Sequence, residues 1–116
     1  MSVVTTLMLH IDHIEEGVTL DTINRWFAER RSSWLFDNTD ADDAWGGGKA
    51  PQVTVYAGAF NFFPTDEFLA YLAALPWEYP ESVQLFVNEE HDTRFAIYLL
   101  TADRSWRQLC DGGGAG

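Results

Sequence analysis

Four segments of the chain alternate between two kinds of side chain with a period of two, and segments of other character separate them. The alternation runs over residues 3–11, 52–63, 82–88 and 93–101. A period of two places successive side chains on opposite faces of an extended chain, and the β-branched residues here favour strands. The sequence therefore predicts four strands. The last one is apolar on both faces, which indicates a central or doubly covered strand.

Two helices are predicted between these strands. Residues 19–31 repeat apolar side chains at helical spacing, with Thr19 or Asp21 as the capping residue. Residues 65–75 do the same, with Thr65 as the cap and two acids in the first turn, where they favour the helix dipole.

This order of strand, helix, strand, helix, strand, strand predicts an α+β fold. The simplest layered solution is a two-layer sandwich, with two helices on one face of an antiparallel or mixed four-stranded sheet. We expect one domain over residues 1–110, in which residues 103–110 form a short terminal helix. A long acidic loop is predicted over residues 34–50, and residues 111–116 are predicted to form a flexible glycine-rich tail. The pattern leaves the strand order open.

Charge restricts the partners of this chain. Its 116 residues include 18 Asp and Glu against 7 Lys and Arg, giving a net charge of −11 at pH 7. Binding to a phosphate backbone or to an anionic membrane surface needs charge of the opposite sign. The sequence therefore predicts no direct nucleic-acid partner and no membrane partner, and it favours a basic protein.

The cellular compartment is predicted from the absence of three features: disulfides, a secretory signal and a membrane span. Cys110 is the single cysteine, so no intrachain disulfide forms. The first six residues carry no basic segment typical of a secretory signal, and the apolar runs are too short for a membrane span. These features predict a cytoplasmic protein.

One strand carries a possible metal or acid–base site. His10 and Asp12 are two residues apart, so their side chains project from the same face of the strand, and His13 follows. A third ligand is not identifiable, and a solvated polar strand face is the alternative.

The acidic loop has the beginning of a calcium-binding pattern. Asn38, Asp40 and Asp42 alternate, but the positions that need glycine and a bidentate glutamate hold Asp43 and Lys49. A phosphate-binding loop and a nucleophile elbow are also missing from the sequence. We therefore predict a non-enzymatic protein with no catalytic residue, metal or cofactor.

Aromatic and acidic side chains together indicate a binding surface. Rigid aromatic anchors bordered by charges are typical of a patch that attracts a basic partner, whereas a core position is the alternative for any one ring. The aromatic residues at loops or element ends are Trp34, Phe36, Trp45, Phe62, Phe63, Trp77 and Tyr79. The predicted partner-binding residues are Asp37, Asp40, Asp42, Asp43, Trp45, Glu89, Glu90 and Asp92.

The second half of the chain also carries a resemblance. A predicted strand contains Gly58-x-x-Asn61, a helix follows, and Pro76 to Pro80 forms a linker before an acidic hairpin tip at residues 89–92. In this order of elements, residues 50–105 resemble the small α+β immunity proteins of bacterial polymorphic toxin systems. The resemblance implies a non-enzymatic inhibitor that blocks a cognate toxin.

Three functional hypotheses follow. The first is an acidic protein-binding module that neutralises a basic partner, such as a nuclease toxin or a host nucleic-acid-binding enzyme; an inhibitor encoded by a phage would use the same chemistry. The second is a structural or assembly protein that forms homo-oligomers through exposed aromatic side chains. The third is a small metal-binding enzyme centred on His10, Asp12 and His13.

Overall fold

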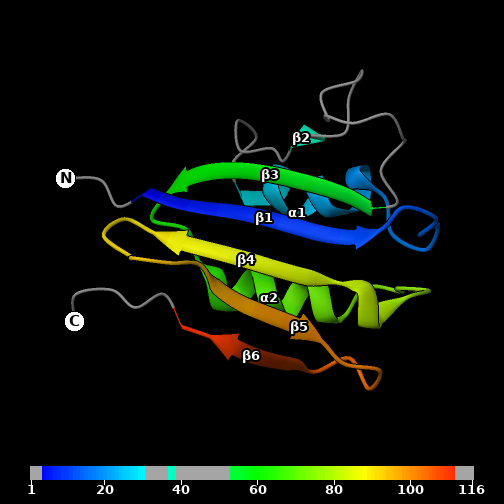
Figure 1. Ribbon diagram of the computed structural model, residues 1–116. Helices are drawn as coiled ribbons and strands as arrows, with labels where there is room; N and C mark the ends of the chain where they lie inside the picture. Colours follow the sequence, from blue (N-terminus) through cyan, green and yellow to red (C-terminus); the bar gives the residue numbers. More distant parts are fainter. Residues whose placement is uncertain (1–3, 31–36, 39–52, 112–116) are drawn as a thin grey trace, which may run out of the picture.

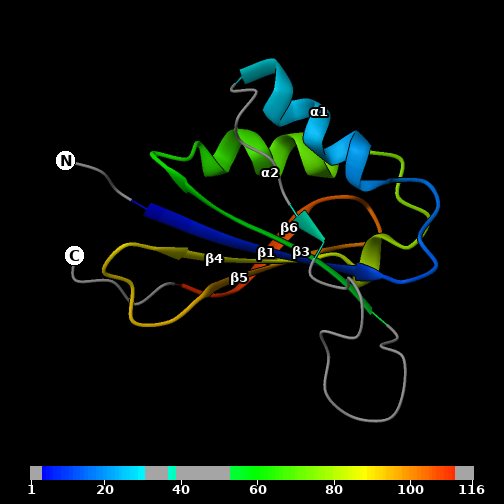
Figure 2. The same ribbon diagram turned by 90° about the horizontal axis from the view of Figure 1, so that it is seen from above.

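Two helices lie on one face of an antiparallel sheet in the computed structural model, which describes residues 4–30, 37–38 and 53–111 (Figure 1). The strand order is β2-β3-β1-β4-β5-β6, and every pair of neighbouring strands is antiparallel. The elements are β1 (Val4–Asp12), α1 (Leu20–Arg30), β2 (Asp37–Asn38), β3 (Val53–Asn61), α2 (Thr65–Ala73), the 3-10 turn η1 (Pro80–Ser82), β4 (Gln84–Glu89), β5 (Ala96–Leu100) and β6 (Trp106–Cys110). Turned by 90°, both helices are seen on the same side of the sheet (Figure 2). The predicted α+β sandwich is confirmed.

The sheet has more strands than the four predicted. Five long strands are joined by the two-residue strand β2, which pairs with β3 inside the segment expected to be a loop. The rest of that segment lies outside the described residues, as do residues 112–116 of the expected tail.

The terminal helix predicted over residues 103–110 is wrong, because β6 occupies its place and pairs with β5. A tight turn precedes β6, in which the Thr101 N–H donates to the Ser105 carbonyl at 2.8 Å and the Ser105 N–H donates to the Thr101 Oγ1 at 3.2 Å. Arg104 in this turn has a φ of 64°. The turn reverses the chain, so that β6 runs antiparallel to β5 and forms hydrogen bonds with its free edge. The short segment has too few residues for a stable independent helix, so this pairing decides its structure.

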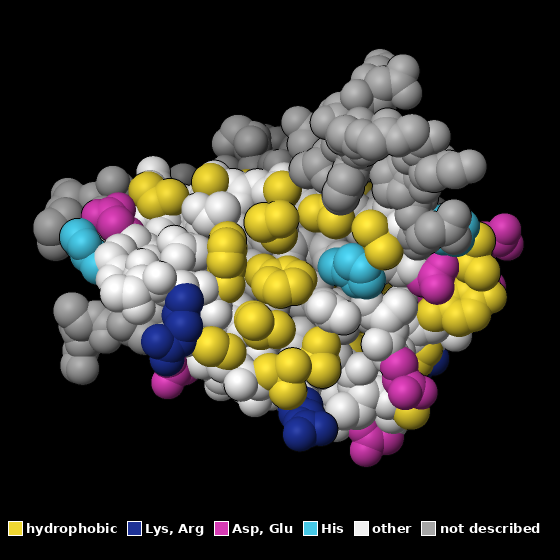
Figure 3. All heavy atoms as spheres, viewed as in Figure 1, with side chains coloured by type: hydrophobic (Ala, Val, Ile, Leu, Met, Phe, Trp, Pro, Cys, Tyr) yellow, Lys and Arg dark blue, Asp and Glu magenta, His cyan; other side chains and the backbone are white. Residues whose placement is uncertain are grey.

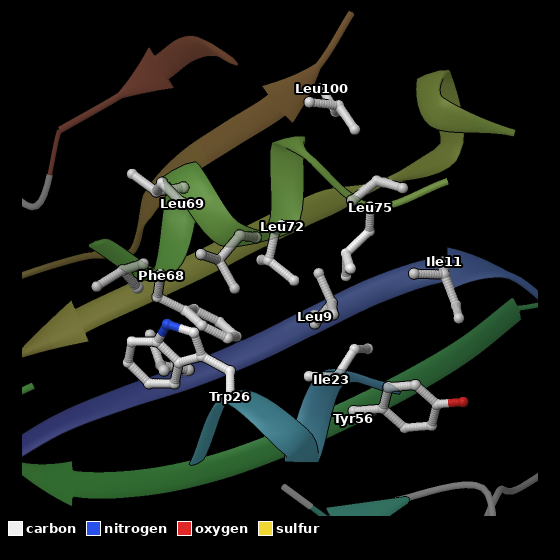
Figure 4. Close-up of a cluster of buried hydrophobic side chains, with 14 of the residues drawn as sticks. Leu9, Ile11, Ile23, Trp26, Tyr56, Phe68, Leu69, Leu72, Leu75 and Leu100 are labelled. Atoms are coloured by element: carbon white, nitrogen blue, oxygen red, sulfur yellow. The ribbon is translucent and has the colours of Figure 1, made fainter. Parts of the chain in front are cut away.

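The two faces of β1 differ in burial. Residues at odd positions, such as Leu7, Leu9 and Ile11, are buried beneath the helices, whereas those at even positions lie on the opposite face. The buried set continues into both helices through Ile23, Trp26, Phe68, Leu69 and Leu72, which belong to the same cluster as Leu9 (Figure 4). Burying each large side chain stabilises the fold by roughly 1.5–3 kcal/mol, so this layer holds the two helices on the sheet.

The two helix starts differ in their capping. Of the two predicted candidates, Thr19 caps α1, since its Oγ1 accepts a hydrogen bond from the Thr22 N–H at 3.3 Å. Thr65 is not the cap of α2, because Pro64 occupies the capping position and no side chain caps the helix. Thr65 instead begins the helix, and its N–H donates to the Phe63 carbonyl at 3.0 Å.

A glutamate closes the end of the helical layer. Both carboxylate oxygens of Glu15 accept backbone N–H bonds, from Gly17 at 2.8 Å and from Glu78 and Tyr79 at 2.9–3.1 Å. The loop after β1 is thereby fixed to the segment that follows α2. A Cβ on Gly17 would lie 2.2 Å from the Pro76 carbonyl oxygen, so this close approach requires glycine.

Candidate partner-binding surfaces

Strand pairing brings two acidic segments together at one edge of the sheet. Strand β1 begins with Val4 beside Asn61, the end of β3, and continues with Thr5 beside Glu89, the end of β4. Because β3 and β4 both run antiparallel to β1, their final residues reach the same edge. The chain leaving β3 enters α2 there, and the chain leaving β4 enters the turn to β5. We call the carboxylates of these two segments the acidic end: Asp66, Glu67, Glu89, Glu90 and Asp92.

The acidic end surrounds two adjoining hollows. One, of about 390 Å³, is lined by Phe63, Pro64, Thr65, Asp66, Glu67 and Glu89. The other, of about 240 Å³, is lined by Thr65, Asp66, Val87, Glu89, Asp92, Ala96, Tyr98 and Gln108. Asp66 and Glu89 therefore border both hollows, and among the described lining residues none is lysine or arginine.

The phenol of Tyr98 responds to this charge. Its pKa is raised above 10.0, first because the ring is partly buried and then because Asp66, Glu89 and Asp92 disfavour a further negative charge. Three carboxylates from two distant segments thus act on the same atom.

The turn that presents Glu89 and Glu90 is well ordered by hydrogen bonds. Asp92 donates its N–H to the Glu89 carbonyl at 2.8 Å and accepts the Glu89 N–H on Oδ2 at 2.9 Å. Glu90 donates its N–H to the Val4 carbonyl at 2.8 Å and accepts the Val4 N–H on Oε1 at 3.1 Å. His91, with a φ of 79°, lies at the tip, and its Nε2 is 3.5 Å from Glu90 Oε2. The hydrogen bonds therefore hold these carboxylates in a fixed arrangement.

The structure describes only part of the predicted partner-binding set. Glu89, Glu90 and Asp92 lie together as expected from the hairpin tip. Asp37 belongs to β2. The remaining members lie outside the described residues: Asp40, Asp42, Asp43 and Trp45.

Sequence reasoning missed Asp66 and Glu67, which it assigned only to the first turn of a helix. Their place beside Glu89 depends on both β3 and β4 pairing with β1, and no local pattern in the sequence specifies that arrangement.

The loop aromatics divide between core and surface. Trp77 and Phe63 are buried, and the Trp77 Nε1–H donates to the Leu72 carbonyl at 2.7 Å. Phe62 and Tyr79 are exposed. Trp34 and Phe36 lie outside the described residues, as does Trp45.

The side chains of His10, Asp12 and His13 contact nearby backbone and side-chain atoms. His10 and Asp12 project from the same face of β1, as predicted. His10 Nδ1 lies 2.9 Å from the Ser82 carbonyl oxygen, and Asp12 Oδ1 accepts the Ile14 N–H at 3.0 Å and lies 3.4 Å from His13 Nδ1. Throughout residues 4–30, 37–38 and 53–111, three or more His, Cys, Asp or Glu side chains nowhere gather as a metal site.

The face of the sheet opposite the helices forms a second surface, which we call the open face. Apolar side chains gather across its middle, over β1, β4 and β5 (Figure 3). Met8 pairs with Phe86, and Phe86 pairs with Ile97, so these three share the face, while Phe95 meets the Phe86 ring edge-on at 6.2 Å. Leu99 also belongs to it, and Arg107 and Cys110 on β6 pair with Leu99 and Ile97. Leu109 lies between Gln108 and Cys110, where the register of β5 and β6 shifts, and it is exposed.

The comparisons with known proteins give no guide to these surfaces. The chain matches no protein-family model, no curated protein and no solved structure. Within the part of the chain that the structure describes, neither helix has the length and apolar character needed to cross a membrane.

Proposed function

We propose that this protein is a non-enzymatic binding module that neutralises a basic protein through its acidic end. The observation that supports the proposal is the convergence of carboxylates from α2 and from the β4–β5 turn around shared hollows. Lysine or arginine side chains of the partner enter these hollows and pair with Asp66 and Glu89. A nuclease toxin or another nucleic-acid-binding enzyme presents such cations, because it must bind phosphate.

The charge also governs how the partner arrives. A net charge of −11 attracts a basic protein over a distance set by the Debye length, about 10 Å at 0.1 M salt. Added salt screens this attraction, so association slows and the complex weakens. The fixed carboxylates of the turn then determine the position at which the partner docks.

Affinity capture from the native host tests the proposal. The bait is the full chain, and the bound proteins are identified after washes at low and moderate salt. The test variant combines Glu89→Gln, Glu90→Gln and Asp92→Asn. The control variant combines Glu16→Gln, Glu29→Gln and Glu81→Gln, which removes the same charge from exposed sites elsewhere.

We expect one basic protein to be retained by the wild type and by the control, and to be lost from the test variant. The purified partner should also lose its own activity when the wild type is added. Equal loss from both variants would show that only net charge matters, and retention by the test variant would show that the acidic end is not the site; either result refutes the proposal.

A further inference from the structure

We infer that the open face of the sheet binds a second copy of this chain. Met8 and Leu109 are among its most accessible apolar side chains, at 37% and 52% exposure, whereas Phe86, Ile97 and Leu99 are partly exposed. Val55, at the β3 side of the face, is only 9% exposed. Soluble monomers rarely present a contiguous apolar patch larger than a few hundred Å², and a larger one marks an interaction surface. The face is separate from the acidic end, so this inference does not rest on the function proposed above.

The charge on the open face fits a copy of itself better than a basic protein. Among the described side chains that β1, β3, β4, β5 and β6 direct to this face, only Asp12 and Arg107 carry a formal charge. Lysines and arginines of a basic partner would be buried there without enough carboxylates, which is unfavourable. An equally apolar surface leaves no such charge unpaired.

The order of the strands makes the open face complementary to itself. Strand β4 is the middle one of the five long strands. A two-fold axis between the two faces and parallel to β4 places β1 of one copy over β5 of the other, and β3 over β6. Closed symmetry of this kind is the commonest in homo-oligomers.

In this arrangement, small side chains of one copy face large ones of the other, and opposite charges lie at the same end of the sheet. The small side chains of Ala57 and Ala59 on β3 face the long side chain of Leu109 on β6 of the other copy. Asp12, at the end of β1, lies at the same end of the sheet as Arg107 of the other copy. The two charged strand residues of the face are therefore placed near a charge of opposite sign, and Arg94 beside the face already pairs with Asp111 at 2.8 Å.

The area is sufficient for a dimer. Five strands of five to nine residues, spaced about 4.8 Å apart and rising about 3.3 Å per residue, make a face of about 400–700 Å². Two copies then bury about 800–1,400 Å², a range that includes the roughly 1,000 Å² expected of a biological interface.

The dimer and the complex with a basic partner respond to salt in opposite directions. Two copies that each carry a net charge of −11 repel one another, and salt screens that repulsion. Dimerisation therefore strengthens as salt rises, whereas binding through the acidic end weakens.

Sedimentation equilibrium of the full chain at several protein and salt concentrations tests the inference. The test variant is Leu109→Glu, at 52% exposure, and the matched control is Ile14→Glu, at 50% exposure in the loop after β1. Met8→Glu is a second test variant on a strand at the centre of the face, and far-ultraviolet circular dichroism checks that each variant folds.

We expect a monomer–dimer equilibrium whose dissociation constant falls as salt rises. Leu109→Glu and Met8→Glu should raise that constant about tenfold or more, because each buries an unpaired charge, while Ile14→Glu leaves it near the wild-type value. A monomeric wild type at every concentration and salt, a dimer that weakens with salt, or equal weakening by Ile14→Glu would overturn the inference. Retention of the partner by the acidic-end variant would refute the proposed function and leave this equilibrium in place, so the two proposals fail separately.

Discussion

Leu9 and Met8 are neighbours on β1, yet they lie on opposite faces of the sheet. Leu9 is completely buried beneath α1 and α2, whereas Met8 is 37% exposed on the open face. Both faces carry apolar side chains, but only one is covered by helices (Figure 2). Alternation in a sequence therefore identifies the two faces of a strand without indicating what covers each of them.

The two faces of the sheet also differ in how much they contribute to the stability of the fold. The covered face holds a cluster of large rings and leucines that fixes the helices. Both helices pack on the covered face, so the open face contributes less to the fold of a single copy. Substitutions on the two faces should therefore change different measurements.

The largest expected effect tests this separation on β1. Leu9→Ala should lower the free energy of unfolding by about 2–5 kcal/mol, because it leaves a cavity in a fully buried cluster. Met8→Ala should lower it by less than about 1 kcal/mol, because that side chain is partly exposed. Urea unfolding at a protein concentration below the dimer range measures both. Similar losses for the two variants would show that the open face is covered in the folded monomer.

The next effect concerns the closure of the covered face. Gly17→Ala should lower the free energy of unfolding by about 1–3 kcal/mol, because its Cβ would meet the Pro76 carbonyl oxygen at 2.2 Å and the backbone has to shift. The exposed neighbour Glu16 provides the control, since Glu16→Ala should stay within about 0.5 kcal/mol of the wild type. Thermal unfolding monitored by circular dichroism compares the two variants. A Gly17→Ala variant as stable as the wild type would show that the close contact with the Pro76 carbonyl does not require glycine.

The smallest effect reports on the acidic end. The pKa of Tyr98 is raised by burial and by nearby carboxylates, so the folded state binds this proton more tightly than the unfolded state does. The resulting stability is present below the unfolded pKa, near 10.0, and is lost as pH rises through the folded pKa. Glu89→Gln should therefore lower the pKa of Tyr98, while the distant Glu81→Gln should not.

Absorbance titration of the tyrosines measures this shift, and Tyr98→Phe identifies which part of the signal belongs to that residue. An equal shift in Glu81→Gln would mean that Tyr98 senses only the net charge of the molecule.

Much of the fold could be predicted because its pattern is local. Period-two alternation identified β1, β3, β4 and β5 and their faces, and Thr19 marked the start of α1. The strand β6 could not be predicted, since its structure depends on the free edge of β5 rather than on its own short pattern. Thr65 was misassigned because Pro64 already occupies the capping position.

The acidic end could be predicted only in part for the same reason. Glu89, Glu90 and Asp92 are adjacent in the sequence, so a hairpin tip brings them together. Asp66 joins them through the pairing of two strands with β1, which is a long-range property. Phe62 and Phe63 show the same limit: they are neighbours, but a φ of 52° at Phe62 turns one ring outward while the other is buried.

We propose that the acidic end, rather than the charge of the whole molecule, binds the basic partner. The most direct measurement is the salt dependence of the dissociation constant for the captured partner, with the wild type, the Glu89→Gln/Glu90→Gln/Asp92→Asn variant and the Glu16→Gln/Glu29→Gln/Glu81→Gln variant. We predict that the constant rises steeply with salt for the wild type and for the second variant, and that it is larger and much less dependent on salt for the first. Equal slopes for the two variants would contradict the account.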